Sequence, residues 1–219
     1  MDTYRIIRNA VHLKNFDTPG ARLTMSPVGR IPERPAGLAG RARAGSVLIA
    51  LYAAGGALHV ILIKRRADLR HHPGQISFPG GRREPGETAL ACALRETREE
   101  IGIAPGRLTV AGPLEPAYII ASDFCIHPFV AWHAGIPACT PDPREVDGVY
   151  MVPLSSLCAP DVRVSRAVSV LGAQRSVPGF LVRGQHVWGA TALLLNELLE
   201  RLKAAGWRGS QDCGGPVQS

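Results

Sequence analysis

Apolar and polar residues follow one another along this chain in stretches that predict a mixed α/β protein. Residues 46 to 63 read SVLIALYAAGGALHVILI and contain no Asp, Glu, Lys or Arg. A run of this length resembles a membrane span, but Gly55 and Gly56 interrupt it and both flanks are rich in β-branched residues. We therefore predict two buried strands joined by a tight turn at these glycines, and no contact with a membrane.

Residues 88 to 102 show the 3.6-residue period of a helix. At about 100° per residue, one narrow apolar stripe contains Leu90, Leu94, Thr97 and Ile101. This stripe is expected to face the core. Thr88 is a suitable N-cap, and Gly102 stands where helices commonly end in a left-handed glycine.

The other elements are predicted more coarsely. We expect a short amphipathic helix at residues 3–14, an extended Pro-, Gly- and Arg-rich segment at 17–45, strands near 107–110, 124–132 and 149–152, a proline-rich loop at 135–144, a hairpin at 162–170 and 177–183, and a closing helix at 190–204. In domain terms, residues 1–44 are an N-terminal helix and arm, residues 45–205 are one domain, and residues 206–219 are a flexible tail.

Carboxylates on the helix at 88–102 form the first candidate site. The segment from residue 81 reads GRREPGETALACALRETREEIGI, which is the spacing G-x5-E-x7-R-E-x-x-E-E-x-G. Glu96, Glu99 and Glu100 gather on one arc, where Glu96 and Glu100 repel each other at i, i+4. An isolated Glu-Glu pair would indicate only a solvated surface. The complete spacing, glycines included, indicates a site for Mg²⁺ or Mn²⁺ and phosphate.

This segment resembles the signature box of the Nudix hydrolases, enzymes that cleave a nucleoside diphosphate linked to another group. The matching residues are Gly81, Glu87, Arg95, Glu96, Glu99, Glu100, Gly102 and Ile103. Thr97 departs from the pattern, because the family usually has an aliphatic residue there, and its hydroxyl is expected to bond to a carbonyl of the preceding turn. The resemblance implies an α/β/α sandwich with a central mixed sheet, and metal-assisted hydrolysis of a pyrophosphate bond.

The resemblance also implies roles for the charged residues of the box. Glu96 and Glu100 would hold the principal Mg²⁺ or Mn²⁺, with Glu99 as a further ligand or as the residue that orients water. Arg95 would act as an orienting residue through an ion pair to a glutamate of the box. Gly80 and Gly81 would let the backbone approach the metal and the phosphates closely.

A general base outside the box is less clearly marked. Glu145 is the first candidate, because the Glu-Val pair before a late strand resembles one in the same family. A solvated loop carboxylate explains Glu145 equally well, and Asp123 is a weaker alternative. The sequence leaves the base open.

A second motif precedes the box. Residues 61 to 81 read ILIKRRADLRHHPGQISFPGG and resemble the coenzyme A pyrophosphatase branch of the Nudix family. The positions that match are Leu62, Arg65, Arg70, Gly74, Phe78, Pro79, Gly80 and Gly81. Residues 187–199 also resemble the closing helix of this branch, whereas Ile63 and Arg66 replace a Thr and a Ser of the motif.

The branch resemblance implies a polyanionic substrate. Lys64, Arg65 and Arg70 are the expected substrate contacts, together with the two glycines, because guanidinium forks and ammonium groups suit phosphates. Hydrolysis of coenzyme A or a derivative would give 3′,5′-ADP and 4′-phosphopantetheine. Two alternatives stay open: a pyrophosphatase for ADP-ribose or another nucleoside diphosphate derivative, and a Nudix module that senses a nucleotide without cleaving it.

Composition agrees with a small anionic substrate. The chain has 219 residues, a formal charge of +7 and a pI near 9.6, but its positive charge lies on scattered arginines without a nucleic-acid-binding motif. Five cysteines form no CxxC pair, so neither a disulfide framework nor a zinc site is indicated. Arg5, Arg8 and Lys14 interrupt any signal-peptide pattern, and we expect a cytoplasmic protein. An arm at the N-terminus is compatible with a homodimer.

Overall fold

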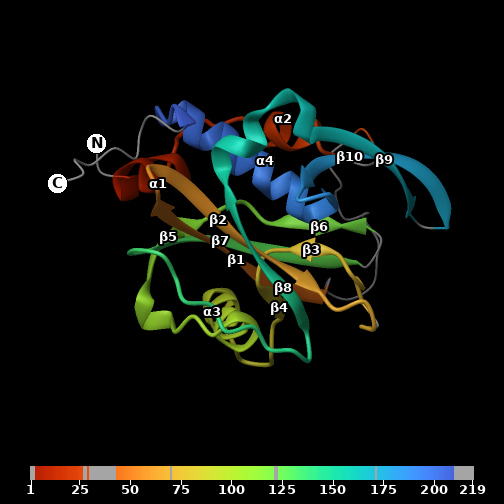
Figure 1. The fold of residues 1–219 in the computed structure, drawn as a ribbon, viewed down its shortest axis with the longest axis horizontal. Coiled ribbons are helices and arrows are strands. Elements are labelled where there is room, and N and C mark those ends of the chain that lie inside the picture. Colours follow the sequence, from red (N-terminus) through yellow and green to blue (C-terminus); the bar gives the residue numbers. More distant parts are fainter. Residues whose placement is uncertain are drawn as a thin grey trace.

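The computed structural model describes residues 3–26, 29, 43–69, 71–120, 123–170 and 172–209. Helices cover both faces of a large mixed sheet (Figure 1), so the predicted α/β fold is confirmed. The α-helices are α1 (Thr3–Val11), α2 (Thr18–Leu23), α3 (Ala89–Ile101) and α4 (Gly189–Ala204). Short 3-10 turns occupy Pro105–Arg107, Leu154–Cys158 and Pro160–Val162.

Eight strands of the described residues form the main sheet. They are β1 (Arg43–Ala54), β2 (Ala57–Arg65), β3 (Ile76–Ser77), β4 (Gly80–Arg82), β5 (Leu108–Pro113), β6 (Ala117–Ile119), β7 (Phe124–His133) and β8 (Val146–Pro153). The order β3-β2-β1-β7-β5 is extended by β4 on β1, β6 on β7 and β8 on β2. Only β1 and β7 run parallel in these pairs. The turn at Gly55 and Gly56 joins β1 to β2, as predicted.

A second, antiparallel sheet consists of β9 (Arg163–Val170), β10 (Ala173–Val182) and β11 (Gln185–Trp188). The predicted hairpin is therefore confirmed, although β11 was not expected. In Figure 1 the β9–β10 hairpin extends away from the main sheet, on the same side as α4. The chain then enters α4 directly after Trp188.

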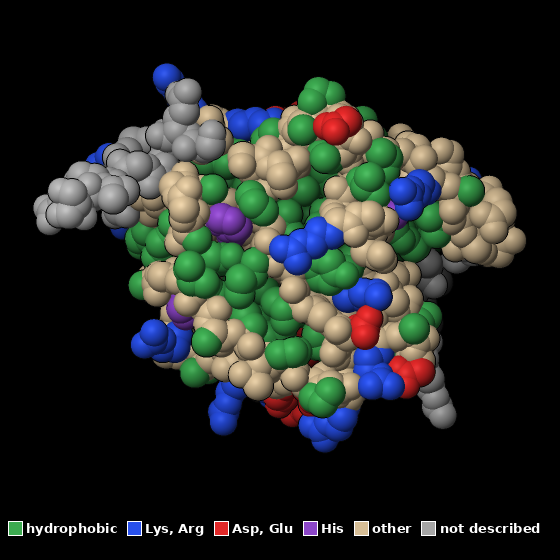
Figure 2. All heavy atoms as spheres, in the orientation of Figure 1, with side chains coloured by type: hydrophobic (Ala, Val, Ile, Leu, Met, Phe, Trp, Pro, Cys, Tyr) green, Lys and Arg blue, Asp and Glu red, His purple; other side chains and the backbone are tan. Residues whose placement is uncertain are grey.

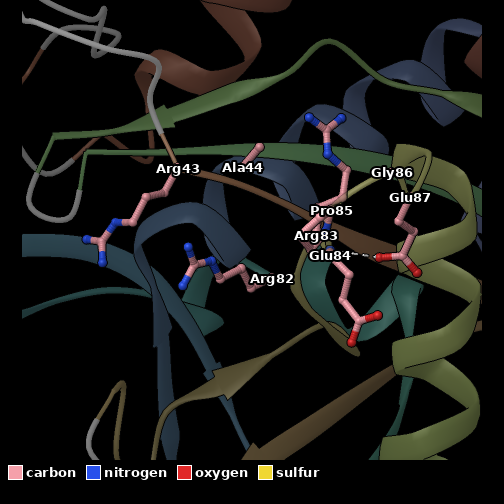
Figure 3. A pocket seen from close by; sticks show the side chains of 8 residues that line it. All are labelled: Arg43, Ala44, Arg82, Arg83, Glu84, Pro85, Gly86 and Glu87. Atoms are coloured by element: carbon pink, nitrogen blue, oxygen red, sulfur yellow. Dashed lines mark hydrogen bonds between the residues drawn. The ribbon is translucent and has the colours of Figure 1, made fainter.

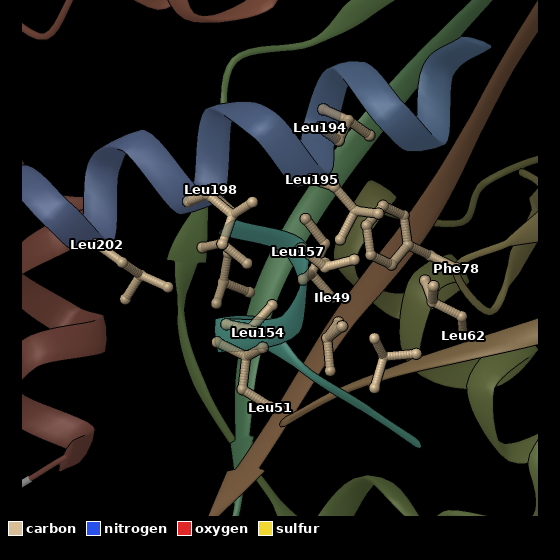
Figure 4. Packing of buried hydrophobic residues seen from close by; sticks show 14 of the residues in the cluster. Ile49, Leu51, Leu62, Phe78, Leu154, Leu157, Leu194, Leu195, Leu198 and Leu202 are labelled. Atoms are coloured by element: carbon tan, nitrogen blue, oxygen red, sulfur yellow. The ribbon is translucent and has the colours of Figure 1, made fainter. Parts of the chain in front are cut away.

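Leucines of α4 cover one face of the main sheet. Leu194, Leu195 and Leu198 are buried against β1 and β2 side chains such as Ile49 and Leu62 (Figure 4). Full burial of a leucine stabilises a fold by about 1.5–3 kcal/mol, so this helix supplies much of the core. Helix α1 joins the same cluster through Ile6, Ile7, Ala10 and Val11.

Helix α3 covers the opposite face, but its buried side differs from the prediction. Ala93, Thr97 and Ile101 are buried together with Glu100, whereas Leu90 and Leu94 are only half-buried. Because the small Ala93 packs against the sheet, the buried face of α3 is rotated by about one residue position, toward Glu100, from the predicted stripe. The Thr97 hydroxyl donates to the Ala93 carbonyl at 2.7 Å, so the expected bond to the preceding turn is confirmed.

The N-terminal segment contains a helix that the sequence did not predict. Instead of an extended segment from residue 17, Thr18–Leu23 forms α2, because the Asp17 side chain caps it at the Gly20 amide and a proline occupies its first turn. Residues 27, 28 and 30–42 of the predicted arm lie outside the described residues, as does most of the predicted tail. None of the helices described is long and apolar enough to cross a bilayer.

A buried ionic cluster attaches α2 to α4. Glu197 is fully buried and accepts from Arg22 on one carboxylate oxygen and from Arg201 on the other, each at 2.7 Å. Arg22 also donates to the carbonyl oxygens of Glu115 and Pro116. We call Arg22, Glu197 and Arg201 the buried clamp, and it joins segments that lie 175 residues apart.

Candidate active site

Capping at both ends fixes the position of α3 and therefore of its carboxylates. The Thr88 hydroxyl accepts from the Ala91 amide at 3.1 Å, and Gly102 ends the helix in the left-handed region at φ 75°. Both features were predicted from the sequence. The helix lies beside β4 and β1, so Glu96 and Glu100 face the strand that contains Gly80 and Gly81.

Glu100 is a buried carboxylate held from two sides. Its side chain is 2% exposed, with Oε1 3.0 Å from the Arg65 guanidinium and Oε2 2.8 Å from the Gly80 amide. Burial raises the pKa of Glu100 to about 8, and the nearby charges of Glu96 and Glu145 act in the same direction. The Gly80 amide and Arg65 offset only part of this effect, so an extra positive charge at this place would be strongly favoured.

Arg95 connects three glutamates of the box. Its guanidinium lies 2.9 Å from a carboxylate oxygen of Glu87, of Glu96 and of Glu99. Hydrogen bonding to Arg95 lowers the pKa of Glu87 to about 2, and the same contact raises the pKa of Arg95. The expected ion pair between Arg95 and the box is confirmed, and Arg95 orients the carboxylate face of α3.

The two glycines of β4 permit a close approach between the strand and α3. A Cβ atom on Gly81 would lie 2.4 Å from the carboxylate carbon of Glu96. A Cβ on Gly80, whose φ is +156°, would lie 2.3 Å from the Ser46 carbonyl oxygen. Gly80 is therefore required by the backbone of β1, whereas Gly81 leaves space for a functional side chain.

The structure brings Glu145 to the same cluster. Its carboxylate lies 4.0 Å from the Arg65 guanidinium and is about half exposed. Burial, and to a smaller extent the charge of Glu145, raises the pKa of both Glu96 and Glu100. Asp123, the alternative base, instead accepts a hydrogen bond from the Tyr118 hydroxyl at 2.9 Å.

The basic residues upstream of the box are in ion pairs. Lys64 lies 2.8 Å from Asp147, and Arg65 contacts Glu100 and Glu145. Arg66 pairs with Asp68 at 2.8 Å. The remaining predicted substrate contact, Arg70, lies outside the described residues.

The cluster as a whole has the composition of a divalent-metal site. Among the described residues, five carboxylates, namely Glu87, Glu96, Glu99, Glu100 and Glu145, form ion pairs with only two guanidinium groups, those of Arg65 and Arg95. Oxygen donors with excess negative charge suit Mg²⁺ or Mn²⁺. Within the described part of the chain, no three His, Cys, Asp or Glu side chains lie close enough together to hold a metal ion. One oxygen of Glu96 accepts a hydrogen bond from Arg95 and one oxygen of Glu100 accepts a hydrogen bond from Arg65.

An open pocket of about 820 Å³ lies beside the start of α3 (Figure 3). Its walls are Arg43, Ala44, Arg82, Arg83, Glu84, Pro85, Gly86 and Glu87. Charged side chains of both signs also gather in the lower part of the surface in Figure 2, on the side of α3. Sequence reasoning missed the arginines of this pocket, although the Arg-Arg pair directly after Gly81 is a visible signal.

Comparison with known proteins gives a family and several relatives. Residues 42–171 match the NUDIX domain family. A peroxisomal coenzyme A diphosphatase of Mus musculus (NUDT7) is 35% identical over 128 residues, and Nudix hydrolase 3 of Caenorhabditis elegans is 38% identical over 115. These matches cover 58% and 51% of this chain, and the chain spans only 54% and 48% of the two relatives. An uncharacterized Nudix hydrolase, NudL, of Photorhabdus laumondii is 30% identical over 66% of this chain and 77% of its own.

Solved structures with the same fold are more distant in sequence. A MutT protein from Methanosarcina mazei superposes with a TM-score of 0.51 over 76% of this chain and 96% of its own, at 15% identity. DR0079 from Deinococcus radiodurans superposes with a TM-score of 0.50 over 76% of this chain and 90% of its own, at 16% identity. At such identities the comparison bears on the fold alone.

Proposed function

The chain belongs to the Nudix family, and on this basis we propose that it hydrolyses the pyrophosphate bond of coenzyme A or a derivative with the help of Mg²⁺ or Mn²⁺. The observation that carries the proposal is Glu100, a buried carboxylate beside Glu96 and Glu145 with a pKa raised to about 8. A structural surface helix has no reason to bury this charge. The similarity to a mouse coenzyme A diphosphatase supports the substrate.

Residues of α3 are the proposed ligands of the metal. Glu96 and Glu100 would hold the ion and Glu99 would complete the set, while Arg95 keeps Glu96 and Glu99 in position through its ion pairs. When bound, the metal supplies charge neutralisation on the phosphoryl oxygens and activation of water. Arg65 stands beside Glu100 and can donate to a phosphate oxygen or keep the carboxylate oriented.

Glu145 is the proposed proton acceptor. Its half-exposed carboxylate is open to water, and it lies close enough to the buried cluster to affect the pKa of Glu96 and Glu100. Water that attacks a phosphorus atom at this cluster can release its proton to Glu145. The Arg65 guanidinium, 4.0 Å from the Glu145 carboxylate, attracts it toward the α3 carboxylates.

A substrate panel tests the proposal. Purified protein is incubated with Mg²⁺ or Mn²⁺ and with coenzyme A, dephospho-coenzyme A, ADP-ribose or NADH, and the products are separated by chromatography. We expect release of 3′,5′-ADP and 4′-phosphopantetheine from coenzyme A at the highest kcat/KM. Faster cleavage of ADP-ribose or NADH would favour the first alternative, and binding without any turnover would favour a nucleotide sensor.

Gly81→Ala is expected to lower kcat by roughly 10- to 100-fold, because the added methyl group displaces the Glu96 carboxylate and small misplacements in a reacting site are costly. The free energy of unfolding should change by less than about 1 kcal/mol, since the displaced atoms end a flexible side chain. Steady-state kinetics and urea unfolding measure both effects.

Gly148→Ala is the matched control, because a Cβ there meets only Tyr150 at an ordinary 3.7 Å. Its kcat should stay within about twofold of wild type. Wild-type kcat in Gly81→Ala would show that the position of Glu96 against β4 does not matter for turnover.

A further inference from the structure

Two arginines in the pocket beside α3 have no acidic partner among the described residues. Arg82 and Arg83 are exposed, line the 820 Å³ pocket, and form none of the ion pairs found in the described part of the chain. Figure 3 shows Arg82 and Arg43 projecting on one side of the pocket and Arg83 on the other. Arg82 is the last residue of β4 and Arg83 begins the loop that follows, so the two side chains enter the pocket from different directions.

The upstream basic run contrasts with this pair. Lys64, Arg65 and Arg66 each lie within 3.0 Å of a carboxylate oxygen, so an incoming phosphate would have to compete with Asp147, Glu100 or Asp68. Arg82 and Arg83 carry no such competitor. A phosphate oxygen bound to them gains charge-assisted hydrogen bonds without breaking an existing ion pair.

The two acidic residues that line the pocket, Glu84 and Glu87, do not neutralise its arginines. Glu87 is already bonded to Arg95, which holds the pKa of Glu87 at about 2. Glu84 also lines the pocket, and Figure 3 shows its carboxylate and the Arg83 guanidinium pointing in opposite directions. The pocket therefore presents the guanidinium groups of Arg82 and Arg83 together with one carboxylate, that of Glu84, which is not bonded to Arg95.

We infer that Arg82 and Arg83 bind the phosphate that coenzyme A carries outside its pyrophosphate, on the 3′ carbon of its ribose; this inference rests on the proposed function. Gly81 lies directly against the Glu96 carboxylate, and Arg82 and Arg83 are the next two residues of the chain. A single ribose separates the 3′-phosphate from the reacting pyrophosphate. A pyrophosphate at the α3 carboxylates thus brings the 3′-phosphate within reach of this pocket.

The test is the ratio of kcat/KM for coenzyme A to that for dephospho-coenzyme A, which lacks the 3′-phosphate. In R82Q/R83Q this ratio should fall by about 10- to 100-fold, the loss expected for charge-assisted bonds to one phosphate. R166Q/R175Q, which also removes two exposed positive charges, from β9 and β10, controls for net charge and should leave the ratio unchanged. A ratio within twofold of wild type in R82Q/R83Q would overturn the inference.

A binding measurement separates this inference from the proposed function. Calorimetric titration with 3′,5′-ADP and with 5′-AMP should show a preference for the bisphosphate that R82Q/R83Q loses. If wild type fails to cleave coenzyme A but shows this preference, the proposed function fails and the pocket assignment stands. If wild type cleaves coenzyme A and R82Q/R83Q keeps the wild-type ratio and preference, the pocket assignment fails alone.

Discussion

Glu100→Gln should lower the proposed hydrolysis of coenzyme A by a factor of about 10³ or more while making the metal-free protein more stable at alkaline pH. The loss of activity follows from removing the buried anionic oxygen that faces Arg65 and the Gly80 amide, because catalytic carboxylates at a metal contribute several kcal/mol to the transition state. Steady-state kinetics with Mg²⁺ and with Mn²⁺ measures it.

The gain in stability follows from the raised pKa of Glu100. Its ordinary value is 4.5 and its folded value is about 8, so between these pH values the folded chain keeps a proton that the unfolded chain has released. The free energy of unfolding of the wild type therefore falls from pH 4.5 to pH 8 through this group, and stays lowered above pH 8. Gln has no such dependence, and the variant should be more stable by on the order of 2–4 kcal/mol at pH 9.

Urea unfolding in the presence of a metal chelator, at pH 5 and at pH 9, tests the sign of this pH dependence. The difference in free energy of unfolding between Glu100→Gln and wild type should be small at pH 5 and large at pH 9. Saturating Mg²⁺ should reduce this difference by stabilising the wild type. Glu200→Gln, an exposed site on α4, is the control. If Glu100→Gln retained a tenth of wild-type turnover, or if the difference did not grow with pH, Glu100 would not have the role assigned to it.

Glu197→Ala should have the largest effect on stability, about 3–5 kcal/mol. The substitution leaves Arg22 and Arg201 buried without the carboxylate that both contact, and an uncompensated buried charge is strongly destabilising. Loss of the contact also weakens the attachment of α2 to α4, which then depends on other bonds such as that from Asn196 to the Ala21 carbonyl. Urea unfolding followed by circular dichroism measures the change in free energy.

Glu200→Ala is the matched control on the same helix. Glu200 pairs with Lys203 at 2.8 Å, but both side chains are well exposed, and such pairs contribute less than about 1 kcal/mol. Equal losses in the two variants would show that burial of Glu197 adds nothing to its contribution.

Elements were predicted correctly where their signals come from residues only a few positions apart. The helix from Thr88 to Gly102 is confirmed because capping and periodicity both depend on neighbours within a few residues. The turn at Gly55 and Gly56 is confirmed for the same reason. Helix α2 was missed because six residues that include a proline and a glycine show no period, and its partner Glu197 is far away along the chain.

The site was predicted in its residue types but not in its pairings. The spacing of the box identified the carboxylates, and the family resemblance implied the ion pair of Arg95, one of whose contacts is the i, i+4 pair with Glu99. The contact between Arg65 and Glu100 depends on how β2 lies relative to α3, which no local pattern contains. The branch resemblance favoured Lys64, Arg65 and Arg70 as substrate contacts and did not include Arg82 and Arg83. Only the fold shows which basic residues are already paired with a carboxylate.

The position of α4 has a consequence for biosynthesis. Its leucines cover the sheet, and Glu197 receives Arg22 from the other end of the chain. After α3 has been synthesised, the nascent chain still exposes the apolar face of β1 and β2 until α4 has left the ribosome. Folding of this domain is therefore completed only after α4 has left the ribosome, and a fragment restricted to residues 42–171, the span that matches the family, should aggregate when expressed alone.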